Sequence, residues 1–222
     1  MKLVKILAVS VLLASGMVAK SFAGSSEFAG PYIGISATAI GAAIDGTHTE
    51  TTGASDESNV TKGTAGAIGA TVGAELGYNF PISDVAFVSI NASYNSMDAS
   101  FTADDAMNSD DVTVTLENVM EFSIEPSFSM SDNTAFFIKA GVSEFSLGAS
   151  GTGLDASQSF DLTGQTAAIG TKTISDNGIY IKTEVGITSW DSFTLVGVGT
   201  QDAEVKADVE AAYGRIMIGK KF

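Results

Sequence analysis

Cysteine is absent from this sequence, and histidine occurs only once, at His48. Without thiols the chain can form neither disulfides nor thiolate metal sites, and it has no cysteine nucleophile. His48 lies in a polar stretch, Gly46 to Glu50, with no partner that would make it a catalytic base, so we interpret it as an exposed loop residue. Because no nucleophile, base and orienting group can be identified together, the sequence predicts neither an enzyme nor a bound cofactor.

Basic residues are scarce as well. The chain has 11 Lys and Arg against 26 Asp and Glu, which gives a formal net charge of −15. A chain this acidic repels the phosphates of nucleic acid, and we therefore expect no nucleic-acid partner.

Long apolar runs are also missing, since beyond the N-terminus none approaches the ~20 residues that a membrane-spanning helix requires. The one apolar run, residues 6–14, follows Lys2 and Lys5 and precedes Ser21-Phe22-Ala23, which offers small residues before a cleavage site. We predict that residues 1–23 are a Sec signal peptide cleaved after Ala23, because the run is short for an uncleaved anchor. Cleavage leaves one domain, residues 24–222, with eight basic residues against 26 acidic ones and a net charge of −18.

Turn-forming segments recur along this domain, at 81–84, 130–133 and 174–177, and each precedes a β-branched or aromatic run. Their serines are 48 and 44 positions apart, and the third lies 47 positions before the C-terminal Phe222. Ser, Asp and Asn favour turns because their side chains bond their own backbone. The spacing predicts four hairpins, or eight strands, with longer polar connections at 42–62, 102–111, 151–161 and 191–202.

The strand interiors alternate with a period of two, which is the pattern of a strand with two unlike faces. In the predicted fourth strand, Glu117, Glu121 and Glu125 share one face, and Met120, Phe122, Ile124 and Phe128 share the other. Segments 71–79, 88–95 and 179–187 alternate in the same way. The sixth strand, within 163–174, is weakly patterned, and 179–190 is an alternative position for it.

Alternation alone does not decide which face is inside, because a secreted ligand-binding barrel with an apolar interior alternates equally well. The polar face is mostly Gly, Ser, Thr and Asn, which suits the crowded interior of an eight-stranded barrel. Tight turns on one side and polar connections on the other are also typical of outer-membrane barrels. If the polar face is inside, the charged residues on it point into the lumen; they are Glu75, Glu117, Glu121, Glu125, Lys139, Lys182, Glu184 and Arg215.

Charges in so narrow a lumen must be paired or hydrated, because an isolated buried ion costs several kcal/mol. We favour a structural plug of ion pairs and hydrogen bonds. A polar path for ions, in a narrow porin-like channel, is the alternative. Aromatic residues near the predicted strand ends are interpreted as interfacial girdles; they are Tyr32, Tyr78, Phe80, Tyr94, Phe128, Phe136 and Trp190.

The last strand-like segment, with Tyr213, Ile216, Ile218 and Phe222, resembles the terminal-strand assembly signal of outer-membrane β-barrels. Lys220 departs from that pattern, although its charge could reach the headgroups by snorkelling. Segments 30–34 and 73–80 resemble a common first and second strand of the same class. Together with the repeat, they make the mature chain similar to the OmpA/OmpX and opacity-type eight-stranded outer-membrane barrels.

That resemblance implies the fold class: an all-β, eight-stranded antiparallel transmembrane β-barrel with short periplasmic turns and longer extracellular loops. It also implies location in the outer membrane of a Gram-negative bacterium, insertion by the barrel-assembly machinery, and contact with outer-membrane lipids and lipopolysaccharide. We expect a monomer that contributes to envelope integrity or surface interaction without catalysis.

Four aspartates, Asp104, Asp105, Asp110 and Asp111, are the only weak candidates for a metal site. Their carboxylates are hard ligands of the kind that Ca²⁺ and Mg²⁺ prefer. They lack EF-hand spacing, and an acidic cluster is usually a solvated surface. We therefore interpret this segment as an acidic loop and predict no metal.

Overall fold

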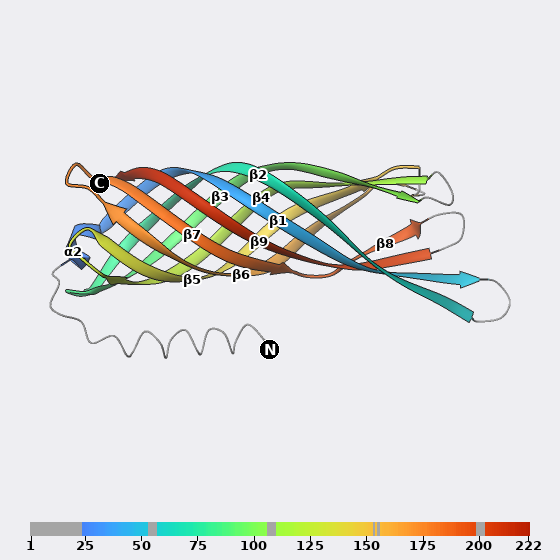
Figure 1. The fold of residues 1–222 in the computed structure, drawn as a ribbon, viewed down its shortest axis with the longest axis horizontal. Coiled ribbons are helices and arrows are strands. Elements are labelled where there is room, and N and C mark those ends of the chain that lie inside the picture. The colour runs from blue at the N-terminus through green and yellow to red at the C-terminus, as the bar shows by residue number, and fades with distance from the viewer. Residues whose placement is uncertain (1–23, 53–56, 106–109, 153, 155, 199–202) are drawn as a thin grey trace.

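The computed structural model describes residues 24–52, 57–105, 110–152, 154, 156–198 and 203–222, and almost all of them are in strands (Figure 1). The predicted signal peptide lies outside these residues and stays a prediction. In the described part of the chain, no helix has the length and apolarity to cross a membrane. The elements are α2 (Ser25–Phe28), β1 (Gly30–Thr52), β2 (Glu57–Ser83), β3 (Ala86–Asp105), β4 (Asp110–Ser129), β5 (Thr134–Ser150), β6 (Gln158–Ile174), β7 (Ile179–Trp190), β8 (Phe193–Val198) and β9 (Ala203–Lys221).

The strands form one closed antiparallel barrel. Each strand pairs with the next, and β1 also pairs with β9, from Tyr32 opposite Lys221 onward, which closes the sheet. β7 and β8 both pair with β9, one after the other, so they are two parts of a single wall strand. The barrel therefore has eight strands, as predicted. The sixth strand is β6, and the alternative position at 179–190 is wrong because those residues form β7.

The two ends of the barrel differ. At one, the turn end, the predicted Ser-Asp segments make tight turns: Ser131 Oγ accepts the N–H of Thr134 at 3.1 Å, and Asn177 Oδ1 accepts the N–H of Ile179 at 3.1 Å. At the other, the hairpin end, strands continue far into the predicted polar connections. The β1–β2 ladder runs as far as Thr52 opposite Glu57, in the middle of the expected 42–62 loop.

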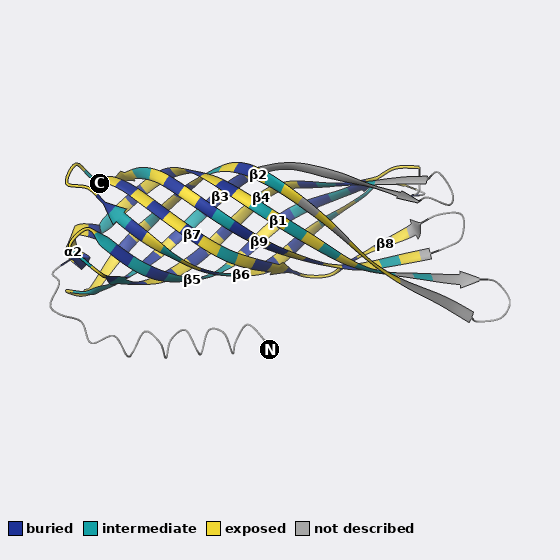
Figure 2. Ribbon diagram, viewed as in Figure 1, coloured by how far each residue is buried: buried dark blue, intermediate teal, exposed yellow. Residues whose placement is uncertain are grey.

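Exposure alternates along the strands through most of the barrel (Figure 2). On β1 the side chains of Ile33 and Ile35 point outward, and those of Tyr32 and Ser36 point inward. Large apolar side chains that face outward recur around the wall; they include Leu76, Phe80, Ile90, Phe122, Ile124, Val142, Ile169, Val185, Ile187, Ile216 and Ile218. Such a belt needs an apolar surrounding, which rules out a secreted barrel with an apolar interior throughout.

One predicted face is wrong because β4 contains a bulge at Asn118. Glu117 pairs with Ser146 of β5, and Val119 pairs with the next residue, Phe145, so Asn118 is an extra residue with a φ of 30°. Its side chain accepts the hydroxyl hydrogen of Tyr94 at 2.8 Å. Because one inserted residue reverses the alternation, Glu117 is exposed on the outside and not in the lumen.

The wall divides at the hairpin end. The β2–β3 ladder stops at Val72 opposite Ser96, and the β6–β7 ladder stops at Gly164 opposite Trp190. Beyond these pairs the strands form two leaves: the first leaf contains β1, β2, β8 and β9, and the second contains β3, β4, β5 and β6 (Figure 1). Two seams without a strand ladder separate the leaves. Across the seam between β6 and β8, the side-chain amide of Gln158 donates to the carbonyl oxygen of Val196 at 2.7 Å and accepts its N–H at 3.3 Å.

Candidate functional site

The interior of the barrel is built in three layers. The turn-end cluster is apolar and aromatic: Phe28, Tyr32, Phe87, Ala135, Ile174, Tyr180 and Met217. The ionic layer lies in the middle: Glu75, Glu121, Glu125, Lys139, Lys172, Lys182, Glu184 and Arg215. The hairpin-end cluster is apolar again: Val114, Leu116, Phe145, Leu147, Ala149, Leu154, Leu162, Trp190, Phe193, Leu195, Ala207, Val209 and Ala211.

The short helix α2 closes the turn end. Phe28 at its end is fully buried and stacks on Phe87, with the ring centroids 4.9 Å apart. The side-chain amide of Asn79 donates a hydrogen bond to the carbonyl oxygen of Phe28 at 2.8 Å, which holds the helix in place. Tyr32 and Tyr180 stack beside this pair at 4.7 Å. The mouth of the barrel is thus filled by aromatic rings.

Glu125 is the centre of the ionic layer. Its carboxylate lies 2.6 Å from the ammonium of Lys182, 2.7 Å from that of Lys172 and 3.7 Å from that of Lys139. Lys172 and Lys182 are directly opposite each other across β6 and β7, where two like charges repel. Glu125, from the far side of the lumen, therefore neutralises a pair of lysines that the sheet register forces together.

The other residues of the ionic layer balance its formal charge. Glu184 lies 2.7 Å from Lys139 and 3.2 Å from the guanidinium of Arg215, and Glu121 lies 3.0 Å from Lys139. Glu75 pairs with Lys182 at 2.7 Å and accepts the hydroxyl hydrogen of Tyr32 at 2.8 Å. Four carboxylates face four cations, so the formal charge of the layer is zero. All eight side chains are buried, and the network joins β2, β4, β5, β6, β7 and β9 across the lumen.

The sequence predicted this network except at two positions. All the predicted lumen residues apart from Glu117 are inside, and all of those belong to the ionic layer. Lys172 was missed because β6 has a weak pattern, although its alternation with Thr171 and Thr173 was a usable signal. Rings of Phe137 and Phe87 lie 4.9 Å and 5.2 Å from its ammonium, which adds cation–π contacts to the ion pair.

Several aromatic predictions need correction. Tyr32 and Trp190 were expected in interfacial girdles but point into the barrel, whereas Tyr78, Phe80 and Tyr94 face outward as expected. Tyr213 also points inward, with its ring under Arg215 at 5.1 Å, while Ile216, Ile218 and Phe222 of the same predicted signal are exposed. Tyr213 sits an odd number of positions from Phe222 and so belongs to the opposite face of β9. The assembly signal itself stays a prediction.

At the hairpin end the apolar side chains point into the barrel and polar side chains point outward, which is the reverse of the membrane belt. Phe145 and Trp190 meet edge to face at 4.9 Å inside the barrel, and Phe160 and Phe193 pack at 5.3 Å between the leaves. On the outside at this level are exposed polar pairs, such as Ser146 donating to Asp161 at 2.9 Å. A polar exterior around an apolar core is the arrangement of a soluble β-sandwich. This reversal indicates that the leaves stand in water, beyond the membrane.

The metal prediction is not tested by the structure. Asp104 pairs with Asp111 and Asp105 with Asp110 near the tip of the β3–β4 hairpin, but their side chains lie outside the described residues. Among the described side chains, no group of three or more His, Asp or Glu residues is arranged to hold a metal ion.

An apolar outer belt around a closed, ion-paired interior defines a transmembrane β-barrel. The chain belongs to the outer membrane protein beta-barrel domain family, whose model matches residues 7–211. No curated protein sequence matches it.

Several solved structures are similar in fold, among them the following two. One is Ail, the attachment invasion locus protein of Yersinia pestis, with 16% identity over 82% of this chain and 98% of that chain and a TM-score of 0.38. The other is Neisserial surface protein A, with 10% identity over 84% of this chain and 97% of that chain and a TM-score of 0.37.

Proposed function

We propose that this outer-membrane β-barrel is a non-enzymatic surface-interaction protein, in which the closed barrel anchors the two leaves outside the membrane. The observation that carries the proposal is the seam between β2 and β3, where neither strand edge has a partner strand in the described structure. A free strand edge presents a row of N–H and C=O groups and is a ready template for another strand.

The edge of β2 is the longer of these templates. Residues 57–71 pair with β1 on one side and with no strand on the other side in the described structure. Ile68 in this segment is 93% exposed, the highest value among the large apolar residues described. The N–H and C=O groups on this side have no partner strand in the described structure, so an extended peptide could add to this edge as a further strand.

Edge pairing is tested by panning displayed random peptides on the full-length protein in lipid nanodiscs. Deleting residues 47–62 joins Gly46 to Gly63, which oppose each other in the ladder and form a favoured two-residue hairpin turn. We expect enriched peptides to bind this shortened protein at least about tenfold more weakly, a loss of about 1.4 kcal/mol.

A matched pair of substitutions separates the edge from the sheet face. Gly41 and Ile68 are direct cross-strand partners and both are exposed, but Gly41 is on β1, which is paired on both sides. Ile68→Lys should weaken peptide binding, because charged residues protect edges, and Gly41→Lys should leave it unchanged. Equal loss in both variants would contradict the proposal, and so would full binding to both the shortened protein and Ile68→Lys, because the deletion leaves residues 63–71 of the edge in place.

We further propose that the lumen does not conduct. The ionic layer is bounded on each side by an apolar cluster, and ions would have to cross both. Planar-bilayer recordings on the folded protein are expected to show no stable conductance steps. Reproducible steps that change in Glu121→Gln or Arg215→Gln would instead support the narrow porin-like channel.

The proposal also covers how the protein is exported and inserted and what surrounds it in the outer membrane. Ile216 and Ile218 face outward on β9, and Phe222 is exposed just beyond its end, where the barrel-assembly machinery and then outer-membrane lipids, including lipopolysaccharide, could contact them. We propose that the protein is exported by the Sec pathway and is a monomer, because closure of β1 on β9 leaves no edge in the membrane-spanning wall.

A further inference from the structure

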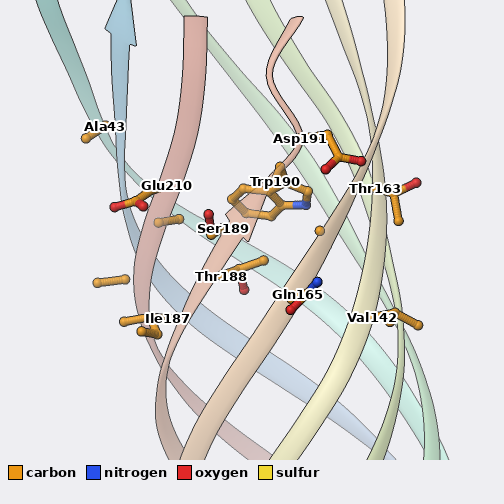
Figure 3. A pocket seen from close by; sticks show the side chains of 13 residues that line it. Ala43, Val142, Thr163, Gln165, Ile187, Thr188, Ser189, Trp190, Asp191 and Glu210 are labelled. Atoms are coloured by element: carbon orange, nitrogen blue, oxygen red, sulfur yellow. The ribbon is translucent and has the colours of Figure 1, made fainter. Parts of the chain in front are cut away.

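The lumen contains a small chamber between the ionic layer and the hairpin-end cluster. Its volume is about 30 Å³, and its wall includes Arg215 of the ionic layer and Trp190 of the hairpin-end cluster. Trp190 and Thr188, which both line the chamber, follow each other on the inner face of β7 (Figure 3). The chamber is therefore the place where the charged and the apolar parts of the lumen meet.

Five side chains of this wall carry polar atoms that have no hydrogen-bond partner among the described residues. Each side chain is buried, with between 2% and 9% of its residue surface exposed; the five are Asn95, Ser143, Trp190, Tyr213 and Arg215. Buried polar atoms are nearly always hydrogen-bonded, and an indole N–H or a phenol hydroxyl inside a protein normally has a partner. Five such groups around one chamber indicate that they share a ligand inside it.

Three glycines of the inner wall hold the larger of these side chains back from the middle of the chamber. A Cβ at Gly73 would lie 2.5 Å from Oδ1 of Asn95, one at Gly164 would lie 2.8 Å from Nε1 of Trp190, and one at Gly186 would lie 2.7 Å from the hydroxyl oxygen of Tyr213. Each of the three side chains therefore lies directly against the wall, over a residue that has no side chain. This arrangement leaves space between them.

The charges around the chamber select a neutral ligand. Arg215 and Glu121 both line it, and both already have partners of opposite charge: the guanidinium lies 3.2 Å from Glu184, and the carboxylate lies 3.0 Å from the ammonium of Lys139. An added ion would be an uncompensated charge beside a layer whose formal charge is zero. Because a buried ion without its own partner is costly, neither an anion nor a cation is favoured here.

Size and hydrogen-bonding capacity then identify the ligand. A single water needs roughly 10–15 Å³ of such space, so the chamber holds about two of them and is too small for an organic molecule. Trp190 and Arg215 can only donate hydrogen bonds, whereas the hydroxyls of Ser143 and Tyr213 and the amide of Asn95 can donate and accept. Water is the small neutral molecule that does both.

We propose that the chamber is a binding site for about two ordered water molecules, which are an integral part of the lumen. They accept hydrogen bonds from Nε1 of Trp190 and Nη1 of Arg215, and they bridge these donors to Asn95, Ser143 and Tyr213. The water thereby joins the ionic layer to the hairpin-end cluster. Because the next layer toward the hairpin end is apolar, this water is held in place and exchanges slowly.

Trp190 reports on this water directly, because it is the only tryptophan of the protein. The full protein, with isotope-labelled tryptophan and folded in lipid nanodiscs, gives a single indole N–H signal in an NMR spectrum. We expect a nuclear Overhauser cross-peak between this hydrogen and water, with the sign of a long-lived, bound molecule. A folded protein without that cross-peak would overturn the proposal.

Two matched serine variants locate the water. Ser143→Val places an apolar side chain in the chamber and should abolish the cross-peak. Ser123→Val is the control, because Ser123 is also a buried serine of the inner face but does not line the chamber, and this variant should keep the cross-peak. Heat-modifiable gel migration checks that both variants are folded, and the unchanged protein decides the proposal even if Ser143→Val does not fold.

Two further results would contradict a water site. A cross-peak that survives in folded Ser143→Val would mean that the water near Trp190 lies elsewhere. Saturable quenching of Trp190 fluorescence by iodide, present in the unchanged protein and lost in Ser143→Val, would mean that the chamber binds an anion. We expect no saturable quenching by iodide in either protein.

Discussion

Replacing Glu125 by Gln is expected to lower the free energy of unfolding by about 3–5 kcal/mol, as loss of one partner from a buried ion network does. The amide can accept a hydrogen bond but carries no charge, so the ionic layer would hold four cations against three carboxylates. The excess falls on Lys172 and Lys182, which face each other across β6 and β7. Denaturant unfolding in lipid vesicles, followed by Trp190 fluorescence and gel mobility, measures the change.

Glu117→Gln is the control for this prediction. It is the same substitution on the same strand, at a residue that alternation alone would also place in the lumen. Because Glu117 is exposed, we expect a change of about 0.5 kcal/mol or less. If both variants were destabilised equally, the carboxylate of Glu125 would have no special part in the network.

Deletion of Asn118 is the second change with a large expected effect. Without the bulge, the residues of β4 before position 118 would follow the same alternation as those after it. Val114 and Leu116 would then leave the hairpin-end cluster and Glu117 would enter it. Exposing these two side chains should cost about 3–6 kcal/mol, and burial of Glu117 adds to that. The loss should appear in the same unfolding measurement.

Cysteine labelling distinguishes a reversed strand from one that is merely loosened. The chain has no cysteine of its own, so a single introduced thiol is specific. In the otherwise unchanged protein, Glu117→Cys should react with a membrane-impermeant maleimide and Leu116→Cys should be protected. Deleting Asn118 should exchange the two results. Asn118→Gly, which keeps the extra residue and tolerates its positive φ, should leave the labelling unchanged.

The number of strands and most of the lumen could be predicted from the sequence for a physical reason. The turn segments near residues 83, 131 and 175 act locally, through side chains that bond their own backbone, so no tertiary information is needed to find them. Glu121 and Glu125 lie on the regular part of β4, after Asn118, and Lys182 and Glu184 lie on β7, which alternates cleanly. A period of two determines the face of every residue on such an uninterrupted stretch once the face of one residue is known.

Other features depended on pairing between distant strands. Asn118 resembles any other strand residue until the register shows Glu117 and Val119 opposite consecutive residues of β5. Lys172 belongs to the ionic layer because β6 places it opposite Lys182 and across from Glu125. Neither relationship is encoded in the neighbouring sequence.

By itself, the sequence determined that this protein has eight strands with one polar, charge-bearing face and one apolar face, because turns and alternation are local properties, and its resemblance to known barrels indicated the outer-membrane class. Only the tertiary structure decided where the barrel ceases to be a membrane barrel. Beyond Gly164 and Trp190 the wall divides, the surroundings change from lipid to water, and the apolar residues move from the outside to the inside. A period of two is the same in both surroundings, so the pattern alone could not locate the reversal.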